Sequence, residues 1–391
     1  MSGGIGAHDD QAWAPVRQRF PVLRDTTYLN CAALGPMPDF LLATYQQAVL
    51  DRQYLTPGDA AARARAELAQ YLGVEGASLS FWTNTTQAIN VVAGSIDWRA
   101  GDEVVVNARD FPSNVLPWLR LRDRGVVVRA AEPEGGRLPL DAIMAQVTNK
   151  TRLVAVSHVL YHTGYRVDVD ALGQVLHPRG ILLSVDGIQA LGLMRPPLSQ
   201  VDFYMGASFK HLLGPRGLGL LYVRPEVAER LIPAMVGYAS VTLDMEDAAG
   251  LADLVQGRAP LAYRDQASRF HLAHVNTEGL SALADLLTFF DSLGWDAITA
   301  RVLHLSGLAL DGLRQVPGVR LVTPLNDAER LSLAVFRVDG WDARALVDRL
   351  AARQIVCAAR AGAVRAAFHV YNEASDVERL VTAVRELARG D

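Results

Sequence analysis

Apolar runs of strand length alternate with helix-like segments between residues 75 and 225 of this 391-residue chain. Two of these runs are Leu153–Ser157 and Ile181–Val185, and each ends at a polar or charged residue. Strands that alternate with helices are typical of βαβ units, in which helices cover a mostly parallel sheet. The sequence therefore predicts an α/β fold whose ligands bind at the carboxyl ends of the strands.

The chain is long enough for two domains, with 50% hydrophobic and 20% charged residues. Its character changes after Pro225, and the last hundred or so residues mix strands such as Leu331–Phe336 with helices such as Trp341–Ala352. We expect a large domain over residues 20–265 and a smaller α+β domain over residues 266–391, with residues 1–19 packing on the smaller one.

A net charge of -4 leaves no basic surface for nucleic acid or an anionic membrane. No run of about 18 apolar residues predicts a membrane span, and the N-terminus lacks the apolar stretch of a secretory signal. Cys31 and Cys357 are far apart and form no disulfide or metal framework, so we expect a cytoplasmic protein without a metal site.

Lysine is scarce, because the chain has only Lys150 and Lys210 among 38 basic residues. An amine can lose its proton and attack an aldehyde, whereas guanidinium stays charged, so Lys210 is the first candidate for a Schiff base. Asp186 ends one apolar run about two dozen residues earlier, and the pair could face a flat cofactor from two sides. From spacing alone, an ordinary exposed acid and lysine would explain the pattern equally well.

The pattern D-x-x-Q, S-x-K, G-P-x-G-x-G is formed by Asp186 and Gln189, Ser208 and Lys210, and Gly214–Gly219. It resembles the pyridoxal-phosphate segment of the class V aminotransferases, fold-type I enzymes that include cysteine desulfurases, selenocysteine lyase and isopenicillin N epimerase. The resemblance implies that pyridoxal 5′-phosphate is held by Lys210 as an internal aldimine. It also implies that Asp186 binds the pyridine nitrogen, Gln189 lies by the phenolic oxygen and Ser208 helps to bind phosphate.

Other segments fit the same family. Thr85 and Thr86 follow a strand and open a helix, and such a position favours anion binding. Thr85 alone could be a plain helix cap. The turn as a whole resembles the family's phosphate-binding turn. Phe111 resembles the aromatic residue or histidine that stacks on the coenzyme, although it could equally be core. Tyr161 stands where desulfurases carry an asparagine near the phenolic oxygen, and the flanking His158 could be an acid–base group or a loop residue.

Two further segments would border the substrate. Asn30 and Ala33 lie in a run of small residues like the family's substrate-facing segment, or in a simple loop. Asn276 lies in a segment that resembles one reaching the neighbouring subunit's phosphate, which implies a homodimer with the site near the interface. There the family's Gly-Thr pair is replaced by Ala273-His274, which puts that contact in question.

Arg365 resembles the arginine that holds the α-carboxylate of the substrate, since a guanidinium fork can bind a carboxylate through two hydrogen bonds. Desulfurases insert a loop with their nucleophilic cysteine before this arginine, but here only Ala358–Val364 precede it. Cys357 is expected to be buried and inert, so cysteine desulfurase chemistry is disfavoured.

These features predict an enzyme in which Lys210 removes the Cα proton of an amino acid, leading to transamination or to β-elimination of the C–S lyase type. Epimerisation, or a silent coenzyme-binding protein, are the alternatives. A dinucleotide site at Gly214–Gly219 fails because the glycine spacing is wrong and a strand follows. The sequence does not identify the amino acid.

Overall fold

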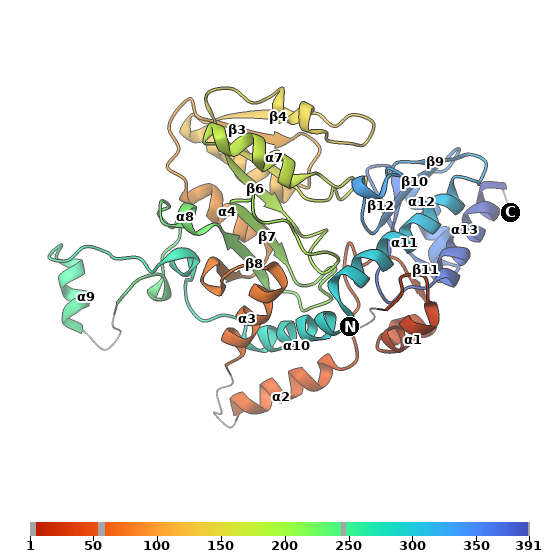
Figure 1. Ribbon diagram of the computed structural model, residues 1–391, viewed down its shortest axis with the longest axis horizontal. Coiled ribbons are helices and arrows are strands. Elements are labelled where there is room, and N and C mark those ends of the chain that lie inside the picture. The colour runs from red at the N-terminus through yellow and green to blue at the C-terminus, as the bar shows by residue number, and fades with distance from the viewer. Residues whose placement is uncertain (1–4, 54–58, 244–247, 390–391) are drawn as a thin grey trace.

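The computed structural model describes residues 5–53, 59–243 and 248–389. Figure 1 shows a large part built around one sheet and a smaller part, drawn in blue, at the C-terminal end of the chain. The helices of the described residues are α1 Asp10–Gln18, α2 Leu41–Gln53, α3 Ala60–Leu72, α4 Thr85–Ser95, α5 Leu116–Leu119, α6 Leu140–Met144, α7 Val169–Leu176, α8 Pro225–Ala228, α9 Ala248–Val255, α10 Thr277–Leu293, α11 Trp295–Leu313, α12 Ala343–Ala351 and α13 Ala374–Arg389. None of them is both long and apolar enough to cross a bilayer.

The large sheet has seven strands in the order β2-β8-β7-β6-β5-β3-β4. Only β8 runs against its neighbours, and all the other pairings are parallel. The strands are β2 Leu79–Trp82, β3 Glu103–Asn107, β4 Val127–Ala131, β5 Thr151–Ser157, β6 Leu182–Asp186, β7 Phe203–Ala207 and β8 Gly219–Val223. The predicted α/β fold with a mostly parallel sheet is confirmed.

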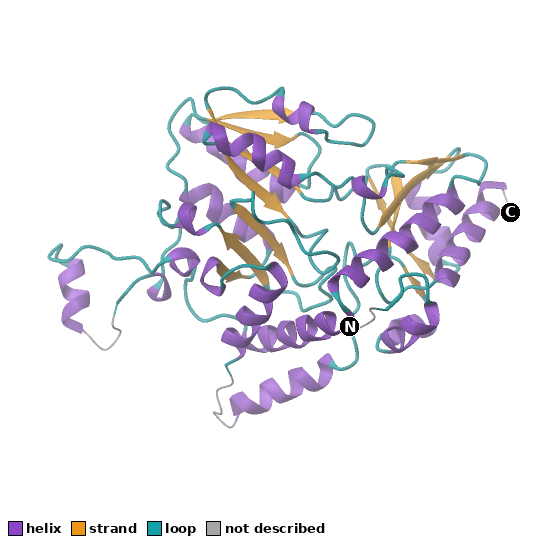
Figure 2. Cartoon of the chain, viewed as in Figure 1, coloured by secondary structure: helices purple, strands orange, loops and turns teal. Residues whose placement is uncertain are grey.

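Both faces of this sheet are apolar and covered by helices (Figure 2). Along β5, Leu153 and Ala155 join one buried cluster, whereas Val154 and Val156 join the other. Side chains of a strand point alternately to opposite faces, so a continuous apolar run is what burial on both faces requires. This double burial leaves the strand ends as the places where polar side chains can gather.

The smaller part contains a four-stranded antiparallel sheet in the order β12-β13-β10-β9. The N-terminal region also reaches this part, because β1 pairs with β11 and the Arg17 guanidinium donates to Asp376 of α13 at 2.7 Å. The remaining strands are β1 Thr27–Tyr28, β9 Val319–Leu321, β10 Leu333–Val338, β11 Ile355–Val356, β12 Ala358–Arg360 and β13 Ala363–Ala367.

Helix α10 packs against α2 and α3, and its apolar side chains belong to the same buried cluster as one face of the large sheet. The division of the chain near residue 265 therefore remains a prediction.

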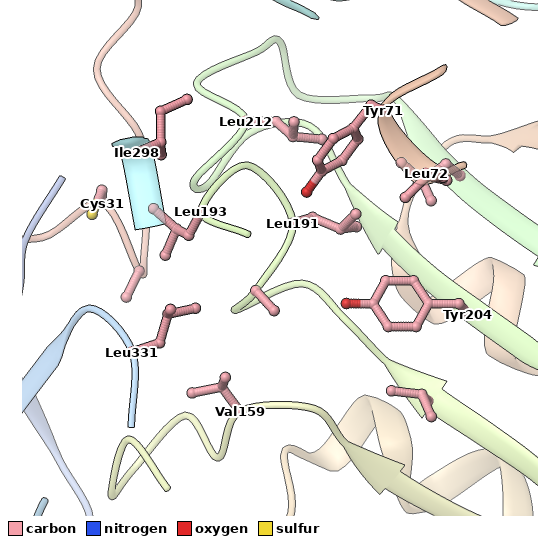
Figure 3. Packing of buried hydrophobic residues seen from close by; sticks show 14 of the residues in the cluster. Cys31, Tyr71, Leu72, Val159, Leu191, Leu193, Tyr204, Leu212, Ile298 and Leu331 are labelled. Atoms are coloured by element: carbon pink, nitrogen blue, oxygen red, sulfur yellow. The ribbon is translucent and has the colours of Figure 1, made fainter. Parts of the chain in front are cut away.

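The loops at the carboxyl edge of the sheet are anchored in the core. Leu212, two residues after Lys210, belongs to the same buried cluster as Leu191 and Tyr71 of α3 (Figure 3). The Tyr71 hydroxyl donates to the carbonyl of Met194 at 2.6 Å and accepts from the N–H of Gly192 at 2.9 Å. These contacts hold the loop that follows β6 and the loop that carries Lys210 in fixed positions.

Strands β12 and β13 are joined by the two-residue turn Ala361-Gly362, whose φ angles are 48° and 72°. Two positive φ angles are what a type I′ hairpin turn requires, and alanine is disfavoured there because of its Cβ. Asparagine tolerates this conformation better. We therefore expect Ala361→Asn to stabilise the protein by about 0.5–1 kcal/mol, measured as a rise of roughly 1–2 °C in Tm.

The β-branched variant Ala361→Val should lower the Tm instead, because its side chain is less compatible with a positive φ. Equal effects of Asn and Val would contradict this explanation of the turn.

Candidate active site

A cavity of about 250 Å³ lies where the carboxyl ends of the parallel strands meet the β12–β13 hairpin. All but three of the residues predicted for the site line this cavity. Its lining consists of Ala32, Ala33, Asn84, Thr85, Thr86, Phe111, Ser113, Tyr161, Asp186, Ile188, Gln189, Phe209, Lys210, Arg360 and Arg365.

Lys210 and Asp186 supply an amine and a carboxyl group to this cavity. Asp186 is the last residue of β6 and its Oδ1 accepts from the N–H of Ile188 at 3.0 Å. Burial raises the pKa of Asp186. Burial lowers the pKa of Lys210 to about 8, while the charge of Asp186 acts to raise it and the charges of Arg365 and Arg360 act to lower it. A lowered amine pKa makes the neutral, nucleophilic form of Lys210 more available near neutral pH.

The N-terminal turn of α4 lines the cavity through Asn84, Thr85 and Thr86. Asn84 caps the helix by accepting from the N–H of Gln87 at 2.9 Å, and the Thr86 hydroxyl donates to Ser113 at 2.7 Å. The Thr85 hydroxyl is buried and has no hydrogen-bond partner. A buried hydroxyl without a partner is costly, so Thr85 beside the helix N-terminus is suited to a bound anion such as phosphate.

Phe111 offers an aromatic face to the cavity, with the Lys210 amine 5.6 Å from its ring centroid. Phe111 is 42% exposed, so its position agrees better with a ligand-facing residue than with a core residue. The buried Asp110 carboxylate fixes the backbone here, because it accepts from the N–H of Phe111 at 2.7 Å and from the Ser157 hydroxyl at 2.6 Å. Phe111 also meets Tyr161 edge-on at 5.4 Å.

Arg365 reaches the cavity from β13 and is only 2% exposed. Its Nη1 donates to the carbonyl of Tyr161 at 3.0 Å, while Nε and Nη2 are buried without partners. Burial, together with the nearby charge of Arg360, lowers the pKa of Arg365 to about 10. Unpaired guanidinium N–H groups in a buried position are suited to a carboxylate.

Gln189 links the cavity to the N-terminal segment. Its Nε2 donates to the carbonyl of Ala32 at 3.1 Å, and its Oε1 lies 2.9 Å from Nε2 of the buried His211. This contact brings the small residues Ala32 and Ala33 to the cavity wall, where they leave room for a ligand.

Three predicted residues lie outside the cavity lining. The Ser208 hydroxyl donates to the carbonyls of Pro215 and Leu218 and so stabilises its own loop. Asn30 bridges to Ala367 of β13, and Asn276 caps α10 while lining a second cavity. The role predicted for Asn276 involves a neighbouring subunit and remains a prediction.

The buried His158 also lies outside the cavity lining, with Nδ1 3.0 Å from the Tyr204 hydroxyl. Burial lowers its pKa to about 3, which does not suit a proton shuttle at neutral pH.

Sequence reasoning missed Arg360 and the hydroxyl of Ser113, both of which line the cavity. Arg360 lies opposite Ala363 in the β12–β13 hairpin, and this register puts it on the same face as Arg365. Both cysteines are buried and absent from this lining, and burial raises the pKa of each thiol to about 12. Within the described residues, no group of three or more potential ligands is arranged to hold a metal ion.

Comparison with known proteins places this geometry in a family. A probable cysteine desulfurase from Methanothermobacter thermautotrophicus is 28% identical over 95% of this chain and 97% of its own length. An isopenicillin N epimerase from Amycolatopsis lactamdurans is also 28% identical, over 97% of this chain and 99% of its own length. The apo structure of a cysteine desulfurase from Thermococcus onnurineus NA1 shares the fold, with a TM-score of 0.86 at 23% identity over 96% of this chain and 98% of the other.

The family model described as aminotransferase class-V matches residues 50–380, which is most of the chain. The protein therefore belongs to the class V aminotransferase family.

Proposed function

We propose that this protein is a pyridoxal-phosphate enzyme in which Lys210 removes the Cα proton of an amino acid, leading to transamination or β-elimination. Pyridoxal phosphate is the coenzyme of the family to which the chain belongs. The observation that carries the proposal is the convergence of an amine, a carboxyl group, an anion site and an unpaired arginine fork on one cavity.

The residues present fit this coenzyme. The unpartnered Thr85 hydroxyl and the helix N-terminus suit its phosphate, and the Phe111 face suits its flat ring. Asp186 supplies the carboxyl group expected at a ring nitrogen, and Lys210 supplies the amine expected at an aldehyde. When bound, the coenzyme supplies an aldehyde that condenses with amines and a ring that takes up the electron pair left at Cα.

The protein side chains then orient the substrate and transfer its proton. Arg365 holds the substrate carboxylate and so fixes which Cα bond faces the ring. Lys210, with its amine free, would take the Cα proton and return it at another atom.

Protein-borne persulfide chemistry is not supported, although several relatives are named cysteine desulfurases. A thiol nucleophile must reach the substrate as a thiolate, whereas Cys31 and Cys357 are buried with raised pKa values. Epimerisation is the second candidate, since one relative is named an isopenicillin N epimerase.

A panel of amino acids added to the purified protein would test the reaction, with absorbance and mass spectrometry as the measurements. Transamination would release a keto acid and aminate the coenzyme, while β-elimination would release the β-substituent. An inverted amino acid would favour epimerisation instead. Failure of every amino acid to exchange its Cα proton with solvent would contradict the proposed activity.

Lys210→Ala should abolish the visible absorbance of the covalently held coenzyme. The control is Lys150→Ala, because Lys150 is the only other lysine and is exposed. After borohydride reduction of the unaltered protein, peptide mass mapping should place the coenzyme mass on the peptide with Lys210. A Lys210→Ala protein that still holds the coenzyme through a covalent imine would overturn the assignment.

The pH dependence of coenzyme uptake should show the effect of the Arg365 charge on the pKa of Lys210. This charge lowers the pKa of Lys210, so in Arg365→Gln the pKa rises and less neutral amine is present at a given pH. We expect the pH midpoint of coenzyme uptake by the apoprotein to rise by roughly half a unit to one unit. Arg365→Lys, which keeps the charge, should leave the midpoint near its original value; a fall in the Gln variant would contradict this account.

A further inference from the structure

The hairpin that carries Arg365 brings a second arginine to the same cavity. In the pairing of β12 with β13, Ala358 lies opposite Arg365 and Arg360 lies opposite Ala363. Directly opposed residues share a face, and so do residues two apart on a strand. Arg360 and Arg365 are therefore diagonal neighbours on one face, and both side chains line the cavity.

Arg360 is half-buried and has few partners of its own. Its Nη1 donates to the carbonyl of Ala359 at 2.8 Å, and no carboxylate of the described residues lies within ion-pair distance. Arg360 and Arg365 thus place two guanidinium groups beside a cavity whose lining contains one carboxyl group, that of Asp186. Like charges gathered in a partly buried site are unfavourable unless an anion accompanies them.

The two anionic groups in the proposed function, the coenzyme phosphate and the substrate α-carboxylate, are assigned to residues other than Arg360. The phosphate of the coenzyme is suited to the α4 N-terminus, and the substrate α-carboxylate is suited to the buried fork of Arg365. Neither group requires the Arg360 guanidinium. Its position beside Arg365 is where the side chain of a bound amino acid could extend.

A wider cavity of about 700 Å³ adjoins this position, since Tyr161 lines both cavities and Ala361 follows Arg360 directly. Arg337, Arg109 and His162 are among its lining residues. Its one lining carboxylate, Asp110, already accepts hydrogen bonds from Ser157, Asn114 and Phe111. The space beyond Arg360 therefore offers the guanidinium of Arg337 to a negatively charged side chain. Arg109 is already ion-paired with Glu132, with 3.7 Å between Nε and Oε2, and burial lowers the pKa of His162, which favours its neutral form.

We propose that the substrate is an amino acid with a second carboxylate on its side chain, and that Arg360 binds this carboxylate. The inference rests on the proposed function, because it takes Arg365 as the partner of the α-carboxylate. It narrows the substrate class to acidic amino acids.

Isothermal titration calorimetry of the holoenzyme tests this proposal with ligands that lack an amino group and cannot condense with the coenzyme. Succinate would be compared with butyrate, and glutarate with pentanoate, so that each pair has the same chain length. We expect each dicarboxylate to bind at least about tenfold more tightly than its partner. Arg360→Gln should remove this preference and leave monocarboxylate binding unchanged, while Arg360→Lys should keep part of it.

The matched control is Arg379→Gln, which removes an exposed arginine charge of α13 outside both cavities and should keep the full preference. Equal binding of both ligand classes by the unaltered enzyme, or a preference that survives in Arg360→Gln, would overturn the proposal. The visible absorbance of each sample is recorded as well. Its presence without a dicarboxylate preference refutes only the role of Arg360, whereas its absence refutes the coenzyme assignment.

Discussion

Burial of the loop that carries Lys210 is the constraint on which the site depends, because burial is the largest cause of the lowered pKa of this amine. This loop lies against backbone on two sides. The N–H of Gly35 donates to the carbonyl of Phe209 at 2.8 Å, and a Cβ at Gly35 would lie 2.1 Å from the Lys210 carbonyl oxygen. A Cβ at Gly192 would lie 2.3 Å from the His211 carbonyl oxygen. Both positions therefore require glycine.

The cavity is completed by segments that are far apart in the sequence. The large sheet supplies Asp186 and the turn before α4, while the hairpin of the smaller part supplies Arg365. The N-terminal segment connects them, since the carbonyl of Leu29 accepts from the N–H of Ala367 at 2.8 Å and Ala32 accepts from Gln189. A shift of the smaller part relative to the sheet would thus change the distance between the carboxylate-binding group and the amine.

Much of this arrangement could be predicted from the sequence, because the residues concerned follow strands or open helices. Thr85, Asp186 and Lys210 lie in one cavity since the carboxyl ends of parallel strands share one edge of the sheet. Contacts that depend on tertiary packing could not be predicted. The Ser208 hydroxyl meets carbonyls of its own loop, and the position of Arg360 depends on the register of a hairpin whose turn has no Asn-Gly signature.

The cationic cavity also couples substrate binding to the basicity of Lys210. Arg365 and Arg360 lower the pKa of this amine while their charges are unpaired, which favours the neutral form that attacks an aldehyde. In the proposed function, a substrate carboxylate that pairs with Arg365 would offset part of that positive charge and so raise the pKa of Lys210. An amine with a higher pKa binds a proton more strongly. On this proposal, the charge of Arg365 would favour nucleophilic attack by Lys210 before the substrate binds, and its pairing with the substrate would favour proton removal afterwards.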